Sequence, residues 1–269
     1  LGSRSIARIR VGDIEVSYED TGTGTAVVLV HGLGNDLYLW DDLAPKLAEQ
    51  HRVIRYDVRG FGATDRPPGP YSLAQLAADL DGLLDVLEIT DAHVLGMSMG
   101  GVIAQRWALD FPGRVRSLLL VSTSSEVGER ARRAWGRLAD AIEARGFDRR
   151  SADASRAFSE EFATRHPEIV TAMGRSNADN DPHAYAAAAR ASGDYAWTED
   201  LGRVDRPVLV VQGMADRLTP PGGSIKMHRA LPRSRLLKLE GVGHHVQIEA
   251  ADLLAGAASG FFAGVDLAG

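Results

Sequence analysis

The 269-residue sequence contains no cysteine. This absence excludes disulfide bonds, thiolate nucleophiles, CxxC redox chemistry and cysteine-ligated zinc. It is typical of cytoplasmic proteins, and we expect that location. For an enzyme that works by nucleophilic attack, the attacking atom is then expected to be an oxygen.

Lysine is also scarce, since only three of the 30 basic residues are lysines, and 36 acidic residues bring the net charge to −6. This balance disfavours nucleic acid as a partner. No apolar run approaches the roughly 20 residues needed to span a bilayer, and the first residues lack the apolar region of a secretory signal. We therefore expect neither a nucleic-acid nor a membrane partner, while homo-oligomerisation stays open.

The composition and the apolar pattern of the chain nevertheless predict a folded domain with a hydrophobic core. Hydrophobic residues make up 45% and charged residues 25%, near the averages of globular proteins. After a predicted hairpin over residues 6–18, short apolar runs alternate with segments of helical spacing. Strands are predicted over residues 26–30, 53–56, 92–95, 118–121, 208–212 and 236–239, and helices over 40–49, 72–87, 102–109 and a last segment ending near 262. This alternation predicts an α/β fold with a mostly parallel sheet and helices on both faces.

Residues 125–200 have a different character, because no buried-strand run occurs there and the segment suggests several helices. We predict a core formed by residues 1–124 and 201–269, and we call residues 125–200 the cap. A helical insertion between two strands of a sheet is a plausible cover for an active site. The alternative is a packed insertion without a functional role.

The stretch Gly96-Met97-Ser98-Met99-Gly100 matches G-x-S-x-G between a predicted strand and a predicted helix. On such a sharp turn the serine backbone is strained, and the flanking glycines relieve the crowding. The turn exposes the hydroxyl beside a helix N-terminus, which favours developing negative charge. Ser98 is therefore the predicted nucleophile.

A serine nucleophile needs a base, and the base needs a carboxylate, in the chain order serine, acid, histidine. Asp216 follows the strand at 208–212, and His244 follows the strand at 236–239. Both lie beyond the carboxyl ends of strands, on the edge where Ser98 lies and where open α/β sheets bind ligands. His245 is a rival for the base, whereas Asp205 precedes its strand and lies at the opposite edge.

The oxyanion of an acyl-transfer intermediate needs two preset donors. We expect them to be the backbone N–H of Met99 and that of Leu33, which follows the strand at 26–30. His31 lies in the same turn and is expected to brace it by hydrogen bonds. The His244-His245 pair lacks the i, i+4 spacing of a helical zinc site, so we expect no metal, and acyl transfer needs no cofactor.

These residues resemble the α/β-hydrolase superfamily along essentially the whole chain. Residues 55–65, RYDVRGFGATD, are similar to the D-x-R-G-x-G-x-S segment of that superfamily, with Thr64 in the place of the serine. We interpret this segment as a structural turn. The resemblance implies an α/β-hydrolase fold with a helical cap.

Within the superfamily the chain resembles 3-oxoadipate enol-lactonases. The similar stretches are Asn35-Asp36-Leu37 with Trp40, Pro67-Pro68-Gly69-Pro70-Tyr71, Ser98-Met99-Gly100-Gly101 and Thr219-Pro220-Pro221. The resemblance makes Trp135 a candidate residue of the substrate pocket, and His31 is a second candidate. One departure is the sequence His31-Gly32-Leu33-Gly34, which many esterases share, where those lactonases often carry a serine-rich loop.

The sequence thus predicts a hydrolase of small carboxylic esters or lactones with a Ser98-His244-Asp216 triad. One alternative is hydrolysis of a carbon–carbon bond in a vinylogous diketone, a meta-cleavage product, on the same triad. Another is a non-catalytic receptor that binds a small molecule under the cap. Cap arginines such as Arg132 and Arg133 could meet a substrate carboxylate, although solvation at the surface is the simpler role.

Overall fold

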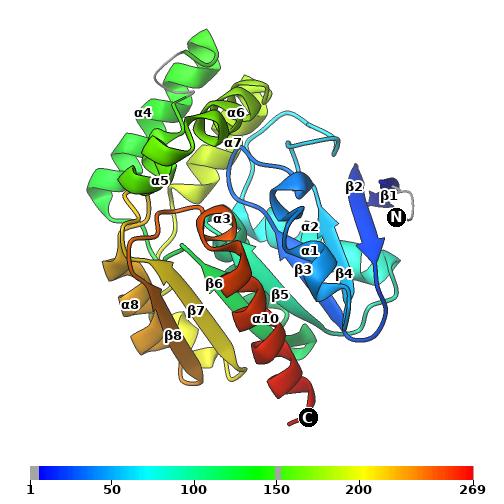
Figure 1. The fold of residues 1–269 in the computed structure, drawn as a ribbon. Coiled ribbons are helices and arrows are strands. Elements are labelled where there is room, and N and C mark those ends of the chain that lie inside the picture. Colours follow the sequence, from blue (N-terminus) through cyan, green and yellow to red (C-terminus); the bar gives the residue numbers. More distant parts are fainter. Residues whose placement is uncertain (1–5, 149–152, 269) are drawn as a thin grey trace.

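A single eight-stranded sheet runs through the computed structural model, which describes residues 6–148 and 153–268 (Figure 1). The strand order is β1-β2-β4-β3-β5-β6-β7-β8. β1 and β2 form the predicted hairpin, β2 is antiparallel to β4, and every neighbouring pair from β4 to β8 is parallel. The strands are β1 (Ala7–Val11), β2 (Ile14–Thr21), β3 (Ala26–Val30), β4 (Arg52–Tyr56), β5 (Ala92–Met97), β6 (Val115–Val121), β7 (Val208–Gly213) and β8 (Ser234–Leu239).

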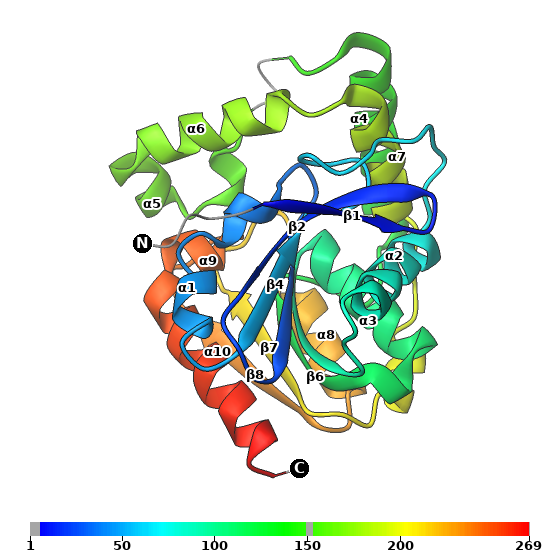
Figure 2. The ribbon, with the colours of Figure 1, turned by 90° about the vertical axis from the view of Figure 1, so that its right-hand side faces the viewer.

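Helices cover both faces of this sheet, as the sequence predicted (Figure 2). One face packs against α2 (Leu73–Val86), α3 (Met99–Asp110) and α8 (Pro221–Ala230), and the other against α1 (Ala44–Leu47), α9 (Val246–Glu249) and α10 (Ala251–Asp266). Side chains of β3 alternate between the two apolar clusters, with Val28 in one and Val27 and Leu29 in the other. The continuous apolar run of β3 therefore packs into the hydrophobic clusters on both faces of the sheet.

Three of the predicted helices differ in extent from the observed ones by more than one residue. The single helix expected over 40–49 is divided into a 3-10 turn (Leu37–Trp40) and α1, because Pro45 lacks an N–H and stands at the start of a new helix. The helix expected from residue 102 begins at Met99, directly after Ser98. The last helix continues to Asp266 rather than ending near 262.

The cap contributes α4 (Glu129–Arg145), α5 (Glu160–Arg165), α6 (Pro167–Ala178) and α7 (Pro182–Ser192) between β6 and β7. These helices lie above the edge of the sheet at the top of Figure 1. α4 and α7 share a small cluster of buried alanines, whereas α5 and α6 pack around the buried Phe158. Among the described residues, no helix is both long and apolar enough to cross a membrane.

Candidate active site

Ser98 occupies a strained turn between β5 and α3. Its φ of 53° and ψ of −118° lie outside the regions that L-residues usually adopt. A Cβ on Gly96 would lie 2.3 Å from the carbonyl oxygen of Gly100, and a Cβ on Gly100 would lie 2.0 Å from the carbonyl oxygen of Val30. The two glycines of the motif are therefore required by the close approach of backbone segments.

Hydrogen bonds from the neighbouring strand hold this turn in place. The Ser98 N–H donates to the carbonyl of Val121 at 2.9 Å. The Thr123 hydroxyl donates to the Ser98 carbonyl at 2.9 Å. Unfavourable backbone geometry persists only where its surroundings determine it, and here the end of β6 and Thr123 just after it supply that support. Ser98 consequently reaches into a cavity under the cap.

Asp216 and His244, the predicted acid and base, are hydrogen-bonded to each other in the structure. The distance between His244 Nδ1 and Asp216 Oδ2 is 2.7 Å, and both side chains are buried. The other carboxylate oxygen of Asp216 accepts the backbone N–H groups of Leu218 and Thr219 at 2.8 and 2.9 Å. Because a carboxylate oxygen can only accept, Nδ1 of His244 donates to it, and in the neutral ring Nε2 is then the nitrogen without a proton, which is the tautomer that a general base needs.

The two rivals occupy different surroundings. His245 accepts a hydrogen bond from Gln247 Nε2 at 2.7 Å and packs against Phe158 at 5.1 Å between ring centroids. Burial and the neighbouring His244 lower the pKa of His245 to about 3, so it is neutral. Asp205 precedes β7 and lies 3.9 Å from Arg233 at the surface, away from the edge that holds Asp216.

His31 braces the turn after β3 and does not line the cavity. Its ring is fully buried, and its Nε2 accepts the N–H of Val58 at 2.9 Å. The proton is then on Nδ1, which donates to the Gly32 carbonyl at 2.8 Å. Burial lowers the pKa of His31, which favours this neutral form. Its expected bracing role fits this geometry, whereas its expected place in the pocket wall does not.

The turn after β3 lies against the candidate nucleophile. A Cβ on Gly32 would lie 3.4 Å from the Cβ of Ser98. Leu33, in the turn after β3, and Met99, at the start of α3, line the same cavity as Ser98. The backbone N–H groups of these two residues are the oxyanion donors that the sequence predicted. The Met99 N–H lies at the N-terminus of α3.

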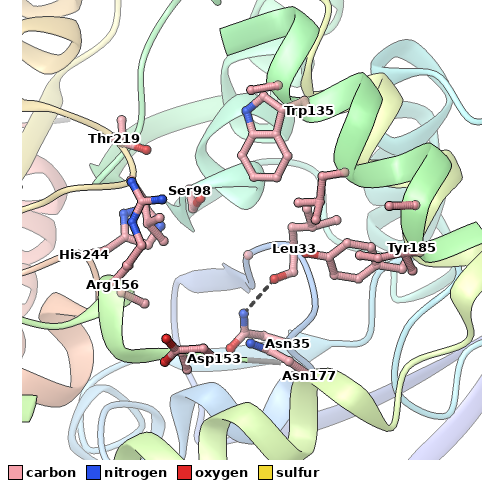
Figure 3. A pocket seen from close by; sticks show the side chains of 18 of the residues that line it. Leu33, Asn35, Ser98, Trp135, Asp153, Arg156, Asn177, Tyr185, Thr219 and His244 are labelled. Carbon is pink, nitrogen blue, oxygen red and sulfur yellow. Dashed lines mark hydrogen bonds between the residues drawn. The ribbon is translucent and has the colours of Figure 1, made fainter. Parts of the chain in front are cut away.

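Ser98 lies at the junction of two cavities under the cap. The larger one, about 580 Å³, is also lined by His244 and by Asn35. The smaller one, about 320 Å³, is lined mainly by apolar side chains that include Val102 and Val127. Both are bordered by the same five residues: Leu33, Ser98, Trp135, Leu218 and Thr219. Trp135 thus lies where the resemblance suggested, in the wall of the cavity from the cap side (Figure 3).

Several residues of the cavity wall carried no signal in the sequence. Three arginines, Arg137, Arg145 and Arg156, line the larger cavity together with Asp148 and Asp153. Figure 3 shows Arg156 on the side of His244 and Asp153 below it. The arginines that the sequence singled out, Arg132 and Arg133, are exposed and pair with Asp194 and Glu129 instead. Helical periodicity alone does not reveal which face of a cap helix meets a cavity.

The segment after β4 has the structural role expected of it. The buried Asp57 accepts the N–H of Leu37 and the N–H of Ala63, both at 2.8 Å. Thr64 donates its hydroxyl proton to the Asp57 carbonyl at 2.7 Å. Across residues 6–148 and 153–268, no group of three or more His, Cys, Asp or Glu side chains is arranged to hold a metal ion.

Comparison with known proteins places this geometry in a family. The family model of the alpha/beta hydrolase fold matches residues 25–251. 3-Oxoadipate enol-lactonase 2 of Acinetobacter baylyi is 32% identical over 210 residues, which are 77% of this chain and 78% of that protein. 2-Hydroxy-6-oxo-2,4-heptadienoate hydrolase of Pseudomonas putida is 31% identical over 258 residues, 90% of each chain.

Among solved structures, a thermophilic esterase from Thermogutta terrifontis, studied with malate bound, superposes with a TM-score of 0.90 at 28% identity. The superposition covers 97% of this chain and 99% of the esterase. The resemblances to α/β hydrolases and to 3-oxoadipate enol-lactonases that the sequence predicted are confirmed. This chain belongs to the alpha/beta hydrolase family.

Proposed function

We propose that this hydrolase cleaves a carboxylic ester or lactone through an acyl-enzyme on Ser98. The observation that carries the proposal is the 2.7 Å hydrogen bond between His244 and Asp216 beside a cavity that Ser98 also enters. In this mechanism Ser98 Oγ attacks the carbonyl carbon while His244 Nε2 takes its proton. Asp216 holds the tautomer and stabilises the imidazolium that forms.

The oxyanion of the tetrahedral intermediate is held by the backbone N–H groups of Leu33 and Met99. His244 then returns its proton to the leaving oxygen, and water hydrolyses the acyl-enzyme by the same proton transfers in reverse order. No cofactor enters these steps. We propose residues 125–200 as the cap that closes this site and residues 1–124 and 201–269 as the core that carries the triad.

The position of His244 indicates which cavity takes which part of the substrate. The leaving oxygen must lie near His244 to receive its proton, and His244 lines the larger cavity. The leaving-group side of the substrate is therefore assigned to the larger cavity and the acyl side to the smaller, apolar one. Among the described residues of the larger wall, three arginines stand against two aspartates, and this balance favours a polar or anionic group there.

The relatives support two chemistries for such a site. One relative is named an enol-lactonase, and the structural neighbour is an esterase. The relative with 90% coverage is named 2-hydroxy-6-oxo-2,4-heptadienoate hydrolase, and this similarity favours hydrolysis of a carbon–carbon bond in a vinylogous diketone as the second candidate. The triad serves both reactions, and the receptor hypothesis predicts neither.

A substrate panel separates these candidates. Wild type and Ser98→Ala would be assayed with short p-nitrophenyl esters, with an enol-lactone that carries a carboxylate on its enol side, with the neutral methyl ester of that side chain, and with a vinylogous diketone. We expect turnover of esters and lactones that Ser98→Ala loses, and a higher kcat/KM for the carboxylate lactone than for its neutral counterpart. Cleavage of the diketone alone would favour the second candidate, and binding without turnover would favour the receptor.

A further inference from the structure

One short segment of the cap, residues 154–159, is bonded to the loop that carries the proposed base. The carbonyl oxygen of Ala157 accepts the backbone N–H groups of both His244 and His245, each at 3.1 Å. The ring of His245 packs against Phe158, which is fully buried. The backbone of His244 is thus held by the cap and not by the core alone.

Glu249 joins the same two segments through its carboxylate. One oxygen of its carboxylate, Oε1, accepts the N–H of Gly243 at 3.0 Å and the N–H of Ser159 at 3.1 Å. Gly243 directly precedes His244, and a Cβ there would lie 2.4 Å from the Ser159 nitrogen and 2.5 Å from Glu249 Oε1. The carboxylate therefore bonds the residue before the base and the end of the cap segment at a place too tight for any side chain.

The loop of the proposed acid is bonded to this segment as well. Arg217 follows Asp216, and its Nη2 donates to the carbonyls of Ser155 and Phe158 at 3.1 and 3.3 Å. The segment also forms part of the cavity wall through Ala154, Arg156 and Ala157. It thus touches the acid loop, the base loop and the space for substrate, and α5, which follows it, lies above α9 in Figure 2.

From these contacts we infer that Glu249 is a positioning residue for His244, which acts through the N–H groups of Gly243 and Ser159. The inference rests on the proposed role of His244 as the base. Glu249 lies outside the walls of both cavities, so it does not touch substrate. Its effect comes from alignment, because small displacements of a catalytic group from its productive geometry reduce the rate strongly.

The test compares two substitutions of Glu249 that differ in one property. Glu249→Gln keeps an oxygen that can accept both N–H groups, whereas Glu249→Met has similar length and no such oxygen. The readout is the rate constant for labelling of Ser98 by a fluorophosphonate, which needs the base but no natural substrate. We expect a loss of roughly tenfold or more in Glu249→Met and less than threefold in Glu249→Gln, at temperatures where circular dichroism shows both to be folded.

Asp181 provides a matched control within the cap. Its Oδ1 also accepts two backbone N–H groups, from His183 and Ala184, both at 2.9 Å, but at the start of α7, and it lines neither cavity that Ser98 enters. Asp181→Ala should lower the melting temperature and leave the labelling rate within twofold of wild type. If the role of Glu249 were merely structural, Glu249→Met would likewise lower the melting temperature and leave the labelling rate within twofold of wild type.

Two results would overturn the inference: labelling of Glu249→Met within threefold of wild type, or an equal loss in Asp181→Ala. If Glu249→Met does not fold, Glu249→Asp shortens the side chain by one methylene and draws the acceptor away from the N–H groups of Gly243 and Ser159, and labelling at the wild-type rate would again contradict the inference. Failure of the proposed Ser98–His244 chemistry looks different, because wild type itself would then not be labelled.

Discussion

The sheet core and the cap are held together in different ways. Every residue of β3, β5 and β7 is buried, and two large apolar clusters sandwich the sheet between them. In the cap, α4 buries only two of its 17 residues, and its cluster with α7 contains just three buried alanines. Dense packing fixes the strand ends that carry Ser98 and Asp216, while the two clusters within the cap bury fewer and mostly smaller side chains.

This difference separates two tasks of the molecule. The core supplies the proposed reacting groups at positions that the fold determines, and most of the wall of the larger cavity around them comes from the cap. Changes in the core should therefore alter kcat or folding, whereas changes in the cap should alter KM and substrate preference. The part of the cap at residues 154–159 is the exception, because it is bonded to the core loops.

The largest expected effect follows from replacing the acid of the proposed triad. Asp216→Asn keeps the shape of the side chain but favours the wrong tautomer of His244, so kcat should fall by roughly 10³–10⁴-fold. Steady-state kinetics with a p-nitrophenyl ester would measure this change. Asp205→Asn, near the other end of the same strand, should change kcat less than twofold. An equal loss of kcat in both variants would contradict the assignment of the acid to Asp216, at the edge of the sheet that holds Ser98.

The next effect concerns a pair of glycines, one in each region. A Cβ on Gly100 would lie 2.0 Å from the backbone of Val30, so Gly100→Ala should lower the free energy of unfolding by about 3 kcal/mol or more. Gly136 lies in α4 with nothing within 4 Å of such a Cβ, so Gly136→Ala should raise stability by about 0.5–1 kcal/mol. Urea unfolding would measure both, and the same sign for both would contradict the comparison.

A smaller effect concerns pH and a histidine buried in the core. Burial lowers the pKa of His93 to about 4, although Asp266 at 3.1 Å opposes that shift. The unfolded chain, with a value of about 6.5, then binds a proton more readily than the folded one. Above about pH 6.5 His93 is neutral in both states and costs no stability. As the pH falls from 6.5 towards 4, the unfolded chain takes up the proton first, so the free energy of unfolding decreases.

Between pH 7 and pH 5 this residue should account for a decrease of about 2 kcal/mol in the free energy of unfolding. His93→Gln removes the titrating ring and keeps a polar group near Ser117, whose hydroxyl lies 2.7 Å from His93 Nδ1. Urea unfolding at the two pH values should show a smaller decrease in the variant. An unchanged decrease would assign the acid sensitivity to other groups.

The smallest effect is expected in the cap. Trp135 borders both cavities, so Trp135→Ala should raise KM by roughly tenfold, about 1.4 kcal/mol, with little change in kcat. Arg132, on the same helix, pairs with Asp194 outside both cavities, and Arg132→Ala should leave both constants within twofold. A large fall in kcat with unchanged KM in Trp135→Ala would place the cap in the chemistry rather than in substrate binding.

The difference between core and cap also explains which functional residues the sequence could predict. Ser98, Asp216 and His244 follow strands with clear apolar patterns, so their shared edge follows from the topology of a parallel sheet. Arg137 and Arg156 had no such signal, because their relation to the cavity depends on how cap helices are oriented. Glu249 acts through backbone groups that are distant in sequence, such as the Ser159 N–H, and no periodicity reports that kind of contact.

The proposed nucleophile is tested most directly by covalent labelling. Wild type and Ser98→Ala would be treated with a fluorophosphonate, and the modified peptide would be identified by mass spectrometry. The proposed mechanism predicts one label per chain, on Ser98, and none in Ser98→Ala. An unlabelled wild type, or a label that persists in Ser98→Ala, would contradict the assignment of Ser98 as the nucleophile.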